Sequence, residues 1–370
     1  MIKLKSLGAA ALAVLAAAGA TFASVPDKNL ERALQSVKPC EAYATTKKLA
    51  SDEFAGRLTG SEGYTRAARW AASKFKEWGL RPISATEGYL QAYPSPYTLV
   101  DKAEMTLLIP EGKPGAAPTK SFKETRLGPN QDFMPLIFTD SGQNEADLVF
   151  AGWGISAPEL SYDDYAGLDV RGKFVLCFRG TPDHADHRFE EYDQHRTRMT
   201  TAKNKGALGI IYIYPEASAN PNGDWIQGFT PAEITEKIAD LIFKEKGLTS
   251  AELTRTLTSL QRPVSFPVSS RLRYSVQSRH FPQGVGYNIL GIVEGSDPAL
   301  KKECIIYGAH FDHCGRHLGF TYPGADDNAS GSAAVMAMAQ AFAGMNPKPK
   351  RSIVFALFGG EEMGLQGSSF

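Results

Sequence analysis

Two continuous apolar runs near the end of the chain constrain its fold more than any other feature. "CIIYGAHFD" at 304–312 and "SIVFALFGGEE" at 352–362 lack the apolar–polar alternation of a strand with one solvated face. Residues 329–345 between them have a helical period, with apolar positions on one face: Val335, Met338, Ala339 and Phe342. The pattern predicts a right-handed strand–helix–strand unit. We therefore expect an α/β fold with a mixed, mainly parallel sheet flanked by helices.

Charged and polar residues follow each of the two predicted strands. His310 and Asp312 end the first run, and Glu361 and Glu362 end the second. The carboxyl ends of parallel strands meet at one edge of a sheet, which is where open α/β sheets bind ligands. These four side chains are therefore expected to converge.

The helix between the strands opens with "GADDNASG" at 324–331, which adds Asp326 and Asp327 to the same edge. So many carboxylates beside one imidazole would repel each other unless a cation lay among them. Nitrogen and carboxylate ligands together favour zinc over magnesium or calcium. Zinc would polarise a carbonyl group and activate water.

The 370 residues have an ordinary globular composition and room for two domains. Residues 27–92 have helical periodicity on both sides of a glycine-rich loop, whereas residues 100–275 carry short β-like runs broken by turns. We predict a first domain formed by residues 24–99 together with 276–370. Residues 100–275 would form an inserted β-rich domain.

The N-terminus is typical of a secretory signal peptide, predicted at residues 1–23. Lys3 and Lys5 precede a short alanine-rich run that ends in small residues at Ala20 and Ala23, either of which would suit cleavage. The run is too short for a stable membrane anchor, so we expect export to the periplasm or the extracellular space. The chain has 40 basic and 40 acidic residues and no basic patch, which argues against nucleic acid as a partner. Four scattered cysteines predict no particular disulfide.

Three motifs, "HFD", "PGADDNASG" and "FGGEEMGLQGS", resemble those of the co-catalytic di-zinc aminopeptidase family. This family also contains glutamate carboxypeptidase-like and transferrin-receptor-like proteins. The loop "LASDEFAGRLTGSEG" resembles its N-terminal segment, and residues 100–275 resemble the protease-associated domain often inserted in it. The resemblance implies a zinc-exopeptidase fold and peptide substrates.

The resemblance also implies roles for five residues. His310 would bind one zinc ion, Glu362 a second, and Asp327 would bridge the two. Asp312 would orient the imidazole of His310, and Glu361 would be the general base and acid. The peptide bond after Asp327 is expected to be cis. Because the family takes a further aspartate and histidine from segments downstream of its Glu-Glu motif, we expect this chain to be the N-terminal part of a longer protein.

Other readings of several residues remain open. His313 and Cys314 could bind zinc, although similar proteins do not use the histidine as a ligand, and Asp326 could replace Asp327 if the register differs by one. "DHADH" at 183–187 has metal-like spacing but is read as a solvated loop. "GRLTGSEG" at 56–63 lacks the ending of a phosphate-binding loop, so we expect it to pack beside the site.

The function predicted first is a secreted zinc-dependent aminopeptidase. A glutamate-releasing carboxypeptidase is the alternative enzyme, but it would need basic residues aimed at a substrate carboxylate. A non-catalytic protein on the same scaffold is a third possibility, although such proteins tend to lose the metal ligands that this chain retains. Substrate preference and oligomeric state are left open.

Overall fold

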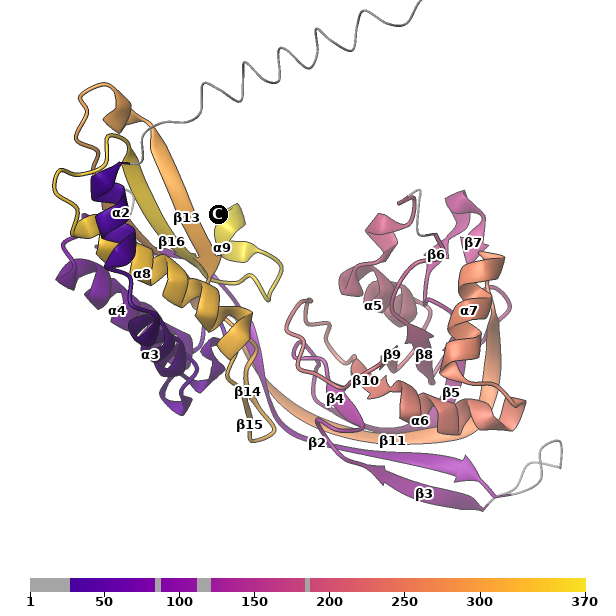
Figure 1. Ribbon diagram of the computed structural model, residues 1–370. Helices are drawn as coiled ribbons and strands as arrows, with labels where there is room; N and C mark the ends of the chain where they lie inside the picture. The colour runs from indigo at the N-terminus through magenta and orange to yellow at the C-terminus, as the bar shows by residue number, and fades with distance from the viewer. Residues whose placement is uncertain (1–26, 84–87, 112–120, 184–186) are drawn as a thin grey trace, which may run out of the picture.

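The computed structural model describes residues 27–83, 88–111, 121–183 and 187–370. They form two larger sheets, of four and eight strands, each with its own helices (Figure 1). The predicted α/β class with mixed sheets flanked by helices is thereby confirmed. The expectation of a mainly parallel sheet is wrong, because most strand pairings in both sheets are antiparallel. The predicted signal peptide lies outside the described residues. No helix in the described ranges is both long and apolar enough to cross a membrane.

The four-stranded sheet contains the predicted strand–helix–strand unit. Its strand order is β1 (Leu90–Pro94), β12 (Val285–Val293), β16 (Ser352–Phe358) and β13 (Cys304–His310). Strands β13 and β16 are parallel, with α8 (Gly331–Ala343) between them in sequence, while the other two pairings are antiparallel. The register pairs His310 with Phe358. Both strands therefore end at the same level, and the residues after them leave the sheet together.

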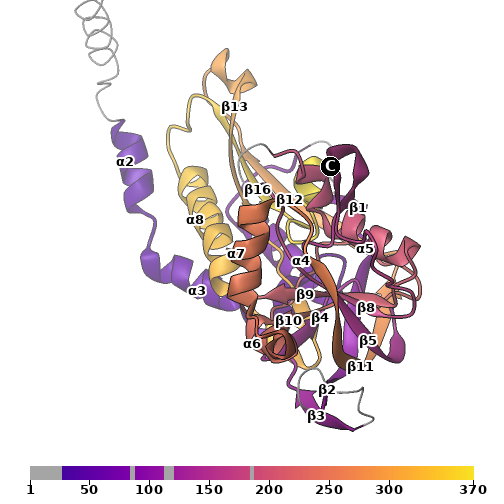
Figure 2. The same ribbon diagram turned by 90° about the vertical axis from the view of Figure 1, so that its right-hand side faces the viewer.

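Four helices lie on one face of this sheet: α2 (Lys28–Gln35), α3 (Pro39–Leu49), α4 (Glu62–Glu77) and α8 (Figure 1). Of these, α2 and α3 pack on the outer side of α8 (Figure 2). The hydroxyl of Ser61 caps α4 by accepting the N–H of Tyr64 at 3.3 Å. Gly79, with φ of 79°, follows its last turn. The helical prediction for residues 27–92 missed β1, which pairs with β12 at the sheet edge.

The eight-stranded sheet is built from the middle of the chain. Its order is β3 (Phe122–Leu127), β2 (Tyr97–Pro110), β11 (Ser265–Phe281), β5 (Gly142–Ala151), β8 (Phe174–Phe178), β9 (Gly209–Tyr214), β10 (Ala232–Thr235) and β4 (Phe133–Pro135). Three helices accompany it: α5 (His195–Asn204), α6 (Glu236–Phe243) and α7 (Ser250–Leu260). A small ribbon, β6 (Ser156–Ala157) with β7 (Tyr162–Asp163), lies beside them.

The two sheets have separate hydrophobic cores. All buried members of the core around the four-stranded sheet lie at or before Leu80, or at or after Ile289. The two clusters around the eight-stranded sheet lie between Val100 and Val276, apart from Cys314. The chain passes from one sheet to the other through β2 and β11, whose Tyr97 and Phe281 rings stack at 4.5 Å.

We therefore predict that residues 97–281 fold when expressed alone, because their buried apolar contacts are almost entirely internal. The isolated segment should give a β-rich circular dichroism spectrum, a cooperative melt and resistance to limited proteolysis. A matched segment of residues 111–264, which lacks both β2 and β11, should be unfolded. An unfolded 97–281 segment would show that its core depends on the rest of the chain.

Candidate metal centre

The predicted convergence of side chains at the strand ends is present. The backbone N–H of Phe311 donates to the carbonyl of Phe358 at 2.7 Å, which extends the β13–β16 pairing by one step. After this contact, the segments that follow β13 and β16 both turn away from the sheet. The residues just beyond this contact are Asp312 after β13 and the Gly-Gly-Glu-Glu turn after β16.

The imidazole of His310 lies among carboxylates. Its Nε2 is 2.9 Å from Oδ1 of Asp327, and its Nδ1 is 4.0 Å from Oε2 of Glu361. Burial alone would lower the pKa of His310, but the carboxylates around it, led by Asp312, outweigh this effect and raise the pKa. Nδ1 is buried without a hydrogen-bond partner among the described residues. This imidazole therefore has donor capacity that the protein itself leaves unused.

Asp312 is fully buried and holds the Glu-Glu turn in place. Its two carboxylate oxygens accept the backbone N–H groups of Glu361 and Glu362, at 3.2 and 3.3 Å. Its Oδ1 is 3.8 Å from Nδ1 of His310, which is longer than a hydrogen bond. Asp312 thus fixes the turn directly, in addition to facing the imidazole as the resemblance implied.

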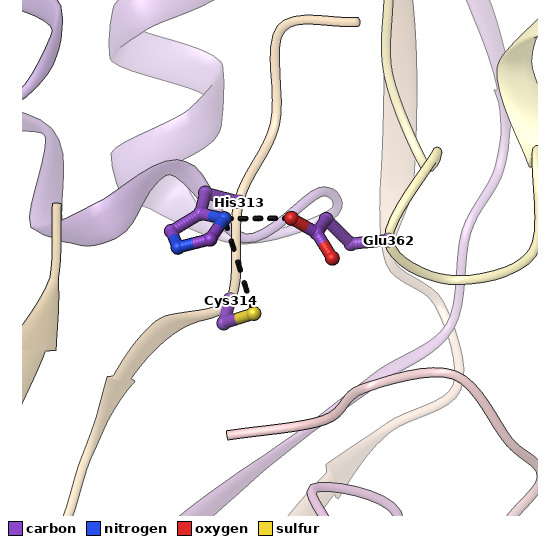
Figure 3. A group of neighbouring side chains, drawn as sticks. All are labelled: His313, Cys314 and Glu362. Carbon is purple, nitrogen blue, oxygen red and sulfur yellow. Dashed lines mark hydrogen bonds and ion pairs between the residues drawn. The ribbon is translucent and has the colours of Figure 1, made fainter. Parts of the chain in front are cut away.

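Glu361 is partly exposed, and burial, followed by the effect of neighbouring carboxylates, raises its pKa. The side chain of Glu361 points towards His310, whereas that of Glu362 points towards His313. Oε1 of Glu362 is 2.6 Å from Nδ1 of His313, and Sγ of Cys314 is 4.0 Å from the same nitrogen (Figure 3). The two glutamates leave the strand in different directions, as successive residues of a strand do.

Two groups of possible metal donors result, and Glu362 belongs to both. The first contains His310, Asp327 and Glu362, and the second contains His313, Cys314 and Glu362. Within each group, one donor atom per residue lies within 4.8 Å of the others. The first group matches the three ligands predicted from the sequence. The second consists of the two residues that the sequence left as less favoured ligands, together with Glu362.

Asp327, not its neighbour, is the aspartate that contacts His310. It lies in the π-helical turn η6 (Ala325–Ser330) that precedes α8. The peptide bond between Asp327 and Asn328 is cis, which confirms the expectation from the resemblance. Asp326 is exposed, and its backbone carbonyl accepts the hydroxyl of Ser330.

Arg57 was missed by sequence reasoning although it connects the segments of the site. It lies at the end of η1 (Asp52–Arg57), is fully buried, and donates to four backbone carbonyls at 2.6–2.9 Å: those of Leu49, Phe311, Pro323 and Gly324. Burial lowers the pKa of Arg57 to about 10, with Asp312 the main opposing charge. The only sequence signal was an arginine inside a glycine-rich loop.

The rest of this loop packs beside the site, as predicted. The hydroxyl of Thr59 accepts the backbone N–H of Gly360, at 2.8 Å, in the turn that carries the two glutamates. Gly56 has φ of 71°, and a side chain there would meet the carbonyls of Gly315 and Tyr322 in the hairpin of β14 (Gly315–His317) and β15 (Phe320–Tyr322). Residues 184–186 of the "DHADH" segment lie outside the described residues. All four cysteines lie within them and are free thiols.

A cavity of about 560 Å³ lies between the two sheets, next to the Glu-Glu turn. Met363 and Gln366, just after that turn, line one side. Trp225, from the loop after β9, lines another, and its ring lies 4.5 Å from that of His280 on β11. The segment carrying the eight-stranded sheet therefore forms part of a cavity that reaches Met363, the residue after Glu362.

Comparison with known proteins agrees with this geometry. Residues 288–370, which contain both strand ends, match peptidase family M28. The chain is thus similar to this family over the segment that carries all three motifs. The family resemblance inferred from the three motifs is thereby confirmed.

Curated relatives extend the similarity over most of the chain. An aminopeptidase of Pseudomonas aeruginosa is 37% identical over 348 residues, which are 92% of this chain and 54% of the relative. The aminopeptidase NAALADL1 of Mus musculus is 34% identical over 109 residues, which are 28% of this chain and 13% of the relative. The chain thus spans about half, or less, of these relatives.

Solved structures of this M28 family share the fold. A peptidase M28 precursor from Shewanella amazonensis SB2B superimposes with a TM-score of 0.60 at 21% identity, over 92% of this chain and 68% of that structure. An aminopeptidase from Aneurinibacillus sp. strain AM-1 gives a TM-score of 0.56 at 20% identity, over 90% and 65%. At these identities the comparison establishes the fold.

Replacing the buried guanidinium of Arg57 should destabilise the protein strongly. Arg57→Met should lower the free energy of unfolding by about 3 kcal/mol or more, because four carbonyls lose their donors and Asp312 loses its compensating charge. Denaturant unfolding would measure the loss. Arg126→Met is the matched control, because Arg126 is exposed and pairs with Glu104 on the surface of the eight-stranded sheet; it should change stability by less than about 0.5 kcal/mol. Equal losses in both variants would contradict the role given to Arg57.

Proposed function

We propose that the chain is part of an exported zinc-dependent aminopeptidase, acting on peptides in the periplasm or outside the cell. The observation that carries the proposal is the group formed by His310, Asp327 and Glu362 beside a free carboxylate, Glu361, at the ends of two parallel strands. The Pseudomonas aeruginosa relative bears the name aminopeptidase. A structural neighbour from Bacillus subtilis with a TM-score of 0.52 is described as a zinc aminopeptidase.

The residues present fit zinc. One imidazole and two carboxylates offer nitrogen and oxygen donors of the kind that zinc accepts in catalytic sites. The surplus of carboxylates around His310, together with the contact between its Nε2 and Asp327, points to a cation as the missing partner. His310, Asp327 and Glu362 would hold the metal, with two ions expected. When bound, zinc supplies Lewis-acid activation of a carbonyl group and of water.

Glu361 is proposed as the group that moves the proton. Its raised pKa makes it a better proton acceptor than an ordinary surface glutamate, and its carboxylate faces His310. It would take a proton from the attacking water as the new carbon–oxygen bond forms. It would return that proton to the amine nitrogen as the peptide carbon–nitrogen bond breaks. Asp312, by holding the N–H of Glu361, is the positioning residue.

The charge around the site favours an amino group over a carboxylate as the recognised end of the peptide. Carboxylates at Glu361, Asp327 and Glu362 line the site, and they would attract the free ammonium group of an N-terminal residue. A carboxypeptidase would instead need a cation directed at the substrate. The buried cation nearest to these groups, Arg57, already donates to four backbone carbonyls and cannot serve.

The cavity beside Met363 would receive the substrate. It is lined by aromatic and aliphatic side chains from both sheets, including Trp225, Phe281 and Ile137. Two of its polar lining side chains already have partners: Asp224 contacts Arg196, and His280 contacts Asp140. An apolar space of this kind suits an uncharged substrate side chain, and it makes the inserted segment part of the binding site.

When Glu361→Gln is introduced into the catalytically active protein, the variant should retain zinc, and its kcat should fall at least about 100-fold. The change removes proton transfer and leaves the three metal ligands in place. Hydrolysis of an aminoacyl-nitroanilide and elemental analysis would give the two readouts. Glu303→Gln, an exposed glutamate paired with Arg351, should change neither. Loss of zinc from the Glu361 variant would show that the roles of the two glutamates are exchanged.

Trp225→Ala should lower kcat/KM about tenfold for substrates with a large apolar side chain and much less for alanyl substrates, since it removes apolar contact area from the cavity. The ratio of the two kcat/KM values is the measurement. Tyr43→Ala, an exposed aromatic on α3, is the control and should leave the ratio unchanged. An unchanged ratio in the Trp225 variant would place the substrate elsewhere.

A further inference from the structure

His313, Cys314 and Glu362 form a second cluster of metal-binding side chains beside the proposed catalytic group. Nδ1 of His313 is 2.6 Å from Oε1 of Glu362 and 4.0 Å from Sγ of Cys314 (Figure 3). The three donor atoms lie within 4.8 Å of one another. Sulfur, nitrogen and oxygen thus face a common point, a combination absent from the His310 group.

The surrounding structure fixes the two residues that are specific to this cluster. The N–H of His313 donates to the carbonyl of Arg57 at 3.2 Å. The imidazole lies against Gly324, where an added Cβ would come within 2.5 Å of Cγ of His313. Cys314 is only 5% exposed, and its thiol donates to the carbonyl of Ala219 at 3.3 Å. Ala219 belongs to the loop after β9, so both sheets contribute to holding the cluster.

We propose that His313, Cys314 and Glu362 form a second binding site for a zinc-like divalent cation, with the Cys314 thiolate as a ligand. Zinc bonds of about 2.3 Å to sulfur and about 2.0 Å to nitrogen in tetrahedral geometry separate those two donors by roughly 3.6 Å. The observed 4.0 Å is close to this separation. The 2.6 Å between His313 and Glu362 must lengthen as the cation replaces their direct contact.

Binding would release the thiol proton to solvent and form a sulfur–metal bond in its place. The hydrogen bond to Ala219 is lost in the exchange, and it is a weak one because its donor is a thiol. The hydrogen bond between His313 and Glu362 is lost as well, and the proton between Nδ1 and Oε1 leaves so that both atoms present lone pairs to the cation. A cation with affinity for thiolate as well as imidazole is therefore the class of ligand expected, which includes zinc, cobalt(II) and cadmium.

The site also has a consequence for catalysis, which rests on the proposed function. Glu362 belongs to both clusters, and its carboxylate now faces His313. A cation bound through Cys314 would draw Glu362 away from His310 and Asp327. Binding at the two sites would then be coupled, and excess zinc would inhibit the peptidase.

Titration of the reduced, untagged chain with cobalt(II) tests the site without any need for activity. Thiolate ligation gives a near-ultraviolet charge-transfer band that histidine and carboxylate ligands do not give. We expect the band in the wild-type chain and in His310→Ala, which disables the first group. It should be absent in Cys314→Ser, and His313→Gln should weaken cobalt binding at least tenfold. Cys304→Ser and Cys40→Ser, which change exposed thiols, should retain the band.

A wild-type chain without the band, or a band that persists in Cys314→Ser, would overturn the site. Cobalt binding that disappears in His310→Ala but is unchanged in Cys314→Ser would also overturn it while supporting the proposed catalytic group. Circular dichroism checks that each variant is folded. If Cys314→Ser fails to fold, the His313→Gln titration decides, because unchanged cobalt affinity there contradicts the site by itself.

Discussion

A fully buried carboxylate, that of Asp312, joins the end of β13 to the turn after β16. A buried anion is costly unless hydrogen bonds and an opposite charge compensate it. Here two backbone N–H groups supply the hydrogen bonds, and the guanidinium of Arg57 supplies the charge. The positions of Glu361 and Glu362 depend on this arrangement, because Asp312 accepts the N–H groups of both.

Arg57 extends the same arrangement to distant parts of the chain. Its guanidinium donates to carbonyls in the last residue of α3 and just after β13 and β15, so the N-terminal loop, the first strand end and the segment before η6 are fixed relative to each other. A lysine could not do this, because a guanidinium offers five donors in a rigid plane and an ammonium offers three at one point. Hydrogen bonds from Arg57 and to Asp312 therefore fix the backbone segments that carry the acidic side chains of the site.

The segment between Tyr97 and Phe281 has its own core, yet it reaches the metal centre at specific points. Ala219 accepts the thiol of Cys314, and Trp225 shares a cavity with Met363. A module joined to the rest of the chain by two adjacent strands can remain an independent unit while its loops complete a neighbouring site. This accounts for a separate core together with a shared cavity.

The sequence by itself predicted the strand–helix–strand unit, helical structure between residues 27 and 92, and the meeting of His310, Asp327 and Glu362 at one edge of the sheet. These predictions rest on local signals that can be read from the sequence alone: continuous apolar runs, the helical period and the polar residues at strand ends. The sequence did not reveal β1, whose five residues are a strand only because β12 supplies hydrogen-bond partners. The role of Arg57 depends on carbonyls up to 267 positions away in the sequence. The placement of Glu362 beside His313 depends on the directions in which these two side chains point after the chain has turned away from β13 and from β16. Only the tertiary structure decided these features, because each requires residues distant in sequence to lie within hydrogen-bonding distance.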